Sequence, residues 1–223
     1  MERKVEELKK IYKDIRIEHF VCDFADTNDQ SLIEGNLNMF GDLDIGIVVN
    51  NAGSVASGYY HTIEPKDIVN DVNVDLYSIF LINRFMIPKL RARNMRSAIL
   101  NVSSATGYLL AGRVGVYSAV KLTLDCYSRI LDLENGDKID VVSLRALGVT
   151  TKMMKMKKGP FMVSPRSFAK ESLVDLISGE KATFGHPRHK LMNSLVFANL
   201  SEKKTFEMFD QLWDKANLKS RGK

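Results

Sequence analysis

The chain has 223 residues, enough for one domain with a sizeable core and too few for two ordinary domains, so we expect a single domain over residues 1–223. Lys and Arg outnumber Asp and Glu by only 32 to 27, and no basic stripe is interleaved with aromatic residues, which argues against nucleic-acid binding. Cys22 and Cys126 lack metal-ligand spacing, and we expect both to be buried free thiols with no metal site. No apolar run approaches the ~20 residues that span a membrane, so we expect no membrane span.

The first elements are a helix and a strand. Residues 2–14 place apolar side chains on one face and charges elsewhere, which predicts an amphipathic helix. Ile15 to Cys22 alternates and then becomes apolar, as a strand does, and Asp23 ends it. Residues 29–39 predict a short helix before the next strand.

Ile45 to Val49 is a continuous apolar strand, typical of a parallel sheet that is covered on both faces. Asn50 to Gly53 then forms a turn. Gly53 permits a backbone conformation and a close approach that a Cβ would block. In α/β sheets, ligands bind beyond the carboxyl ends of the strands, so this turn is a candidate cofactor site, with an ordinary Asn- and Gly-containing loop as the alternative.

Residues 64–94 form the longest helical pattern. Its predicted buried face consists of Ile68, Val72, Ile79, Met86 and Leu90. Asn73 lies near that face, although an Asn inside a helix is usually exposed or bonded to the backbone. Pro88 is expected to kink or end this helix.

The rest of the chain continues the alternation of strands and helices. Strands are predicted at Ala98 to Val102 and Ile139 to Leu144; helices are predicted at Tyr117 to Leu133, from Ser164 to about Ile177, and from Lys203 to about Asn217. Asn135-Gly136 is a typical helix terminator. Together, these elements predict an α/β fold with a doubly wound parallel sheet.

Tyr117 and Lys121 are four residues apart, so on a helix they share a face. A phenol near an ammonium ionises more easily and can exchange a proton with a substrate oxygen near neutral pH. Ser104, at the end of the preceding strand, could hold the same oxygen. The alternative is a half-buried Tyr with a solvated Lys.

Asn50-Asn-Ala-Gly53, Ser103-Ser104 and Tyr117-Ser-Ala-Val-Lys121 follow one another in an order that resembles the short-chain dehydrogenase/reductase family. The resemblance implies a Rossmann-like fold and a catalytic set made of Asn73, Ser104, Tyr117 and Lys121. It also implies that a nicotinamide dinucleotide is contacted by Asp23, Asn51, Ala52, Gly53, Tyr117, Lys121 and Thr151. Asp23 would touch the adenine and Thr151 the nicotinamide amide; without the family, Asp23 would be interpreted as a turn or cap acid.

The chain departs from the family pattern in two places. Ala146-Leu147 stands where the family usually has Pro-Gly. The family's first two strands, and the glycine-rich turn between them that binds the pyrophosphate, have no counterpart here. The alternative function is therefore a cofactor-poor relative that acts as a structural or interaction subunit.

Weaker similarities concern a subgroup. Asp23-Phe24-Ala25, Val149-Thr-Thr-Lys152 and the stretch from Gly185 resemble the very-long-chain 3-oxoacyl-CoA reductases and the 17β-hydroxysteroid dehydrogenases of types 12 and 3. This resemblance implies NADP(H), with NAD(H) not excluded, a lipid-like ketone or acyl-CoA substrate and the endoplasmic reticulum membrane; a homo-oligomer is possible. The basic, Met-rich stretch 151–159 suits a long acyl chain or a phosphate group, and a solvated loop equally well.

Overall fold

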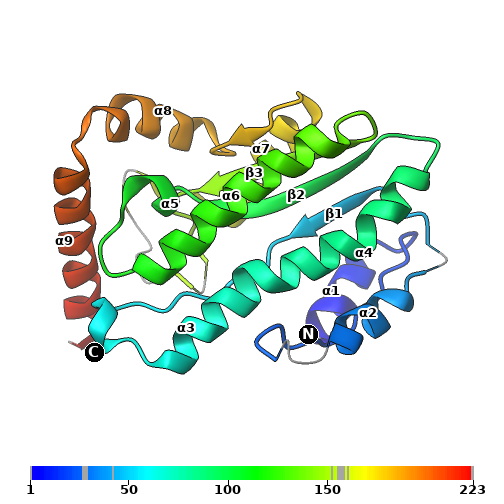
Figure 1. The fold of residues 1–223 in the computed structure, drawn as a ribbon, viewed down its shortest axis with the longest axis horizontal. Helices are drawn as coiled ribbons and strands as arrows, with labels where there is room; N and C mark the ends of the chain where they lie inside the picture. Colours follow the sequence, from blue (N-terminus) through cyan, green and yellow to red (C-terminus); the bar gives the residue numbers. More distant parts are fainter. Residues whose placement is uncertain are drawn as a thin grey trace.

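The computed structural model describes residues 2–26, 30–41, 43–151, 153–154, 159 and 161–221. Within these ranges, four strands form one parallel sheet in the order β1-β2-β3-β4 (Figure 1). The strands are β1 (Ile47–Asn50), β2 (Ser97–Ser104), β3 (Ile139–Ala146) and β4 (Ala182–Thr183). Because every pair is parallel and the connections run through helices, the predicted α/β class is confirmed.

The helices agree with most of the predicted ranges. They are α1 (Glu2–Ile11), α2 (Gln30–Asn38), α3 (Pro65–Val72), α4 (Ser78–Ala92), α5 (Thr106–Leu109), α6 (Gly115–Asn135), α7 (Pro165–Ile177), α8 (Pro187–Leu195) and α9 (Glu202–Arg221). A π-helical turn, η2 (Asn73–Tyr77), joins α3 to α4, and two short 3₁₀ turns are η1 (Tyr60–Thr62) and η3 (Phe197–Asn199). The last helix, α9, extends beyond the predicted Asn217. Helix α7 begins directly after Ser164, whose hydroxyl caps the helix by accepting a hydrogen bond from the Ser167 amide.

Helices cover both faces of the sheet, as a doubly wound fold requires. Figure 1 shows α4 and α6 lying side by side across one face. The core on that face consists of Met86, Leu90, Ile99, Leu131, Ile139 and Val141. On the opposite face, Phe168 and Leu176 of α7 pack on alternate residues of β2 and β3. The two layers hold the carboxyl ends of the strands rigidly, and the candidate site lies at these ends.

Within the part of the chain that the structure describes, strand β1 is an edge strand that is covered on one face. Val48 packs against the α4 side, whereas Ile47 and Val49 are 53% and 51% exposed on the other side. The core beneath α7 is built from β2 and β3 and includes no residue of β1. The predicted burial of both faces of this strand is therefore wrong.

Residues 15–22 do not form the predicted strand. Ile15 is 59% exposed and Val21 77% exposed, and the described part of the chain places no strand alongside them. An alternating pattern becomes a strand only where a neighbouring strand accepts and donates its backbone hydrogen bonds. Without that pairing, the segment runs as an irregular connection between α1 and α2.

The cysteines are free thiols, as predicted, but their predicted burial is wrong for Cys126. Cys22 is partly exposed and Cys126 is exposed. Leu122 and Ile130, one turn before and after Cys126 on α6, are also 44% and 48% exposed. Residues four apart share a helix face, so Cys126 belongs to the outer face of α6.

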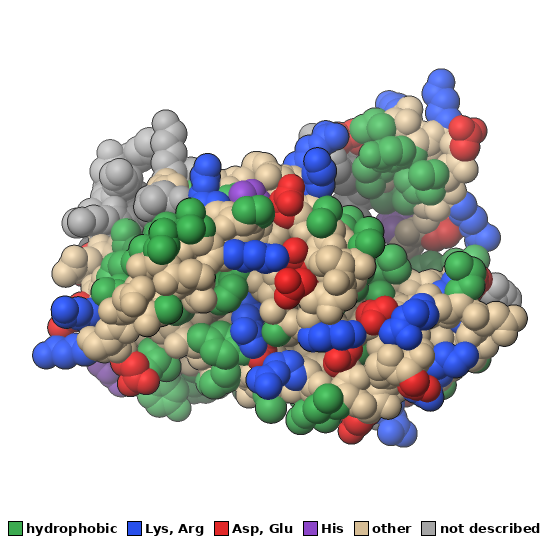
Figure 2. All heavy atoms as spheres, turned by 90° about the horizontal axis from the view of Figure 1, so that it is seen from above, with side chains coloured by type: hydrophobic (Ala, Val, Ile, Leu, Met, Phe, Trp, Pro, Cys, Tyr) green, Lys and Arg blue, Asp and Glu red, His purple; other side chains and the backbone are tan. Residues whose placement is uncertain are grey.

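Charges of both signs are mixed on the surface that Figure 2 shows. Arg91 pairs with Asp137 and Arg96 with Asp140, each with an N–O distance of 2.8 Å. The small positive net charge is therefore not gathered into one patch on this face. None of the helices in the described ranges is long and apolar enough to cross a membrane.

His189 of α8 makes acid stability a testable property. Its side chain is 0% exposed, and its Nε2–H donates to the Phe161 carbonyl at 2.9 Å. Burial lowers the pKa of His189, and the charge of His186 acts in the same direction. The folded state therefore holds the neutral ring, while the unfolded chain takes up a proton below about pH 6.5, so stability falls as the pH drops through that value.

We expect the melting temperature to fall between about pH 7.5 and about pH 5.5, and to fall less in His189→Gln. Thermal unfolding followed by circular dichroism measures both. The exposed His19→Gln serves as the control and should behave as the wild type does. An equal pH dependence in His189→Gln and wild type would exclude His189 as the group responsible.

Candidate active site

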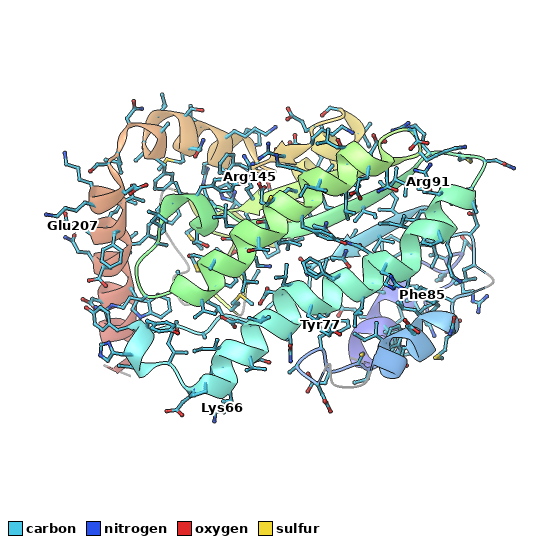
Figure 3. The ribbon with its side chains drawn as sticks, viewed as in Figure 1. Lys66, Tyr77, Phe85, Arg91, Arg145 and Glu207 are labelled. Atoms are coloured by element: carbon cyan, nitrogen blue, oxygen red, sulfur yellow. The ribbon has the colours of Figure 1, made fainter. Side chains whose placement is uncertain are left out.

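The π-helical turn η2 changes the phase of the long helical segment. The extra residue in such a turn rotates all that follows relative to a regular α-helix. Asp75, inside the turn, is 0% exposed; in the last turn of α3 before it, Asp71 is 1% and Val72 39% exposed. The predicted buried face is correct for Ile79, Met86 and Leu90 but wrong for Val72. In Figure 3, Tyr77 marks the end of this turn.

Pro88 lies inside α4, which continues to Ala92, so the proline does not end the helix.

The structure does not bring the Asn73 side chain to Lys121. The Asn73 side-chain amide donates to the Ala25 carbonyl at 2.9 Å and ties the π turn to the segment that follows Asp23. The side chain from η2 that reaches Lys121 is Asp75.

Three of the four predicted catalytic side chains converge at the carboxyl end of β2. Tyr117 lies in the first turn of α6, and Ser104 is the last residue of β2. The Ser104 hydroxyl, which accepts from the Thr106 hydroxyl at 2.9 Å, lies close enough to Tyr117 to lower the pKa of its phenol. The Lys121 ammonium lies 5.6 Å from the centroid of the Tyr117 ring. The spacing of Tyr117 and Lys121 thus places them on one helix face, as predicted.

Lys121 is a buried cation. Its side chain is 4% exposed, and its Nζ donates to the Val102 carbonyl at 2.7 Å. The same nitrogen lies 2.8 Å from Asp75 Oδ1. These contacts exclude the alternative of a solvated Lys.

The turn after β1 packs against the carboxylates of Asp71 and Asp75. The Ser54 amide donates to Asp75 Oδ2 at 2.9 Å, and the Ala56 amide donates to Asp71 Oδ2 at 2.8 Å. A Cβ on Gly53 would lie 2.8 Å from Asp75 Oδ1. The close approach predicted at Gly53 is therefore confirmed, and the group that approaches the glycine is the Asp75 carboxylate.

The charge environment of Tyr117 differs from the prediction. Burial raises the pKa of the Tyr117 phenol above its ordinary value, the negative charges of Asp75 and Asp71 raise it further, and the Ser104 hydrogen bond lowers it only in part. Burial likewise raises the pKa of Asp75, although Lys121 opposes this shift. The effect of Lys121 on the phenol stays a prediction, and burial with the two carboxylates favours the protonated form of Tyr117.

The remaining residues predicted to contact a cofactor lie at the same end of the sheet or in the segments around it. Asn51 and Ala52 are exposed directly after β1. Thr151 is exposed in the segment that follows β3. Asp23 is exposed and its Oδ1 accepts from the Ala25 amide at 2.9 Å, which is the geometry of a turn acid. Most of the basic stretch 151–159 lies outside the described residues.

A third buried carboxylate, that of Asp125, anchors α6 to the sheet. Asp125 Oδ1 accepts from the Ser143 hydroxyl at 2.5 Å and from Arg145 Nε at 2.8 Å. The Tyr108 hydroxyl also donates to Asp125. Arg145 stacks over the Tyr108 ring, 4.3 Å from its centroid, and is labelled at the end of β3 in Figure 3. This cluster fixes the helix that carries Tyr117 and Lys121.

Asp71 and Asp75 are not among the predicted site residues, although the sequence carries a signal for both. They are four residues apart, and Asp75 precedes the buried Ile79 by four more. Acidic residues in line with the apolar face of a helix are costly to bury unless they are paired. Charged residues at core positions of a helical pattern are therefore candidates for a functional site.

Known proteins share both the sequence and the fold. A model of the short chain dehydrogenase family matches residues 1–159. The human very-long-chain 3-oxoacyl-CoA reductase is 29% identical over 196 residues, which cover 85% of this chain and 61% of that protein. The rat protein of the same name is 32% identical over 160 residues, covering 69% of this chain and 50% of that protein. The chain thus spans about half to three-fifths of the length of these reductases.

Solved structures agree at the level of the fold. One comes from a study of 7β-hydroxysteroid dehydrogenase stereoselectivity: its TM-score is 0.80 at 19% identity, covering 94% of this chain and 82% of that one. A short-chain dehydrogenase from Sphingobium yanoikuyae in complex with NADPH has a TM-score of 0.73 at 20% identity, covering 82% and 72%. The match to the family model over residues 1–159 shows that this chain belongs to the short chain dehydrogenase family.

Proposed function

We propose that this chain is part of an NADP(H)-dependent oxidoreductase that interconverts a ketone and a secondary alcohol, with a 3-oxoacyl-CoA or a steroid-like ketone as substrate. The observation that carries the proposal is the convergence of Ser104, Tyr117 and Lys121 at the carboxyl end of β2. The names of the relatives, which include 3-oxoacyl-CoA reductases and a hydroxysteroid dehydrogenase, support the substrate classes.

The residues of the site suit proton donation to a carbonyl oxygen. Tyr117 keeps its proton at neutral pH, because its environment raises the pKa of the phenol. In the direction of reduction, Tyr117 would donate that proton to the substrate oxygen, and the Ser104 hydroxyl would hold the same oxygen by a hydrogen bond. The contacts with the Val102 carbonyl and the Asp75 carboxylate would keep the Lys121 ammonium beside the Tyr117 ring.

The donor set fits a nicotinamide dinucleotide. The Lys121 ammonium would donate to a ribose hydroxyl, and the exposed turn at Asn51 and Ala52 lies beyond the end of a strand, where α/β proteins bind such ligands. Asp23, Gly53 and Thr151 are proposed to complete the contacts. The bound cofactor would supply the hydride that the substrate carbon receives.

An assay of NADPH and NADH consumption tests this function. The full chain would be incubated with each cofactor and, separately, a long-chain 3-oxoacyl-CoA and a steroid ketone, and the alcohol product would be identified by mass spectrometry. We expect product with at least one ketone and faster turnover with NADPH. Absence of product with both cofactors and both ketone classes would contradict the proposal and favour the structural or interaction subunit.

A further inference from the structure

The predicted catalytic set leaves out the two carboxylates at the site, Asp71 and Asp75, and of these Asp75 is the one that pairs with Lys121. It is 0% exposed, and it reaches the site because the π turn η2 brings it to the face of α6. Such turns are frequently found at functional sites, because they place side chains where a regular helix would not. A buried charge that is retained beside Tyr117 calls for a physical role.

Asp75 holds the Lys121 ammonium from one side. Its Oδ1 lies 2.8 Å from Lys121 Nζ, while the Val102 carbonyl accepts from the same nitrogen at 2.7 Å. Asp75 is itself held, because the Ser54 amide donates to its Oδ2 at 2.9 Å. The ammonium is therefore fixed between the π turn and β2, without help from a ligand.

The charged groups that face Tyr117 come from three elements. They are Lys121 on α6, Asp75 on η2 and Asp71 on α3. From β3, the nearest charge is Arg145, which is paired with Asp125 further along α6. One ammonium thus faces two carboxylates, and Tyr117 experiences no net positive charge.

We propose that Asp75 is a positioning residue of the candidate site, which anchors the Lys121 ammonium and cancels its positive charge beside Tyr117. The phenol then keeps its proton over the neutral range and serves as the proton donor. This last step rests on the proposed function and favours ketone reduction over alcohol oxidation; the cancellation of charge does not depend on it. The direction of the shift at Tyr117, to which Asp75 contributes after burial, agrees with this arrangement.

Ultraviolet titration of tyrosinate tests the proposal without cofactor or substrate. The titration curve of the wild-type chain minus that of Tyr117→Phe isolates the ionisation of Tyr117. The same difference is then measured in the Asp75→Asn background, in which the amide can still accept hydrogen bonds but carries no charge. We expect the Tyr117 ionisation to move to lower pH by about one unit or more, because losing one of the two negative charges beside the phenol favours phenolate.

Asp67→Asn, an exposed change on the neighbouring α3, is the matched control and should leave the Tyr117 ionisation in place. If circular dichroism shows that Asp75→Asn is unfolded, Asp75→Ser replaces it, since the smaller side chain leaves room for water beside Lys121. A Tyr117 ionisation that stays at the same pH, or moves upward, in a folded Asp75 variant would overturn the proposal. The titration measures no turnover. A chain without the proposed activity could therefore still show the Tyr117 shift or lack it, and the two proposals are tested separately.

Discussion

Replacing Tyr117 with Phe will reduce the proposed ketone reduction by at least about a hundredfold, because a positioned general acid contributes roughly 10²–10⁴-fold to such a reaction. The change removes only the hydroxyl, from a ring that lies 5.6 Å from the ammonium of the buried Lys121. Steady-state kinetics give the loss in turnover. Cofactor affinity, measured separately by calorimetry, should change little.

Tyr12→Phe is the matched control. Tyr12 is 50% exposed just after α1, away from the carboxyl ends of the strands, and its variant should retain wild-type turnover. Turnover of Tyr117→Phe within a few-fold of the wild type would remove Tyr117 from the catalytic set. Circular dichroism should show that both variants are folded.

Asp125→Ala should cost about 3–5 kcal/mol of the free energy of unfolding, because it removes one partner of a buried ion pair. The change leaves Arg145, whose side chain is 19% exposed, without the carboxylate that it now contacts at 2.8 Å. It also removes the acceptor for the Ser143 and Tyr108 hydroxyls. Denaturant unfolding measures the loss, which is a large part of the stability of an ordinary domain.

Asp14→Ala provides the control for this stability effect. Asp14 is exposed after α1, and replacing a solvated acid usually changes the free energy of unfolding by less than about 0.5 kcal/mol. An Asp125→Ala loss no larger than that of Asp14→Ala would show that the cluster around Asp125 contributes little. The cluster would then not be what fixes α6 on β3.

The parts of the fold that could be predicted are those in which local pattern and tertiary environment agree. The apolar runs at 98–102 and 139–144 became the two central strands, and the periodicity from Tyr117 onward became α6. Tyr117 and Lys121 came together because a helix brings residues four apart onto one face. Ser104 joined them because the carboxyl end of β2 meets the start of α6.

The errors arise where the outcome depends on something outside the local pattern. Residues 15–22 alternate as a strand does, but strand formation requires a paired neighbour, which sequence periodicity does not report. The π turn rotates the helix, so that Asp75 reaches Lys121 where Asn73 was predicted to do so. An α-helical period cannot anticipate that rotation. The raised pKa of Tyr117 likewise depends on tertiary packing, since it follows first from burial and then from the charge of Asp75.

The most direct measurement follows the hydride. NADPH that carries deuterium on the reactive nicotinamide carbon would be supplied to the full chain together with a ketone substrate, and the alcohol product would be analysed by mass spectrometry. The account predicts one deuterium on the carbinol carbon when the stereochemically correct face is labelled, and none with Tyr117→Phe above a small residual rate. An alcohol that forms without deuterium from either labelled face, or no alcohol from any ketone tested, would contradict it.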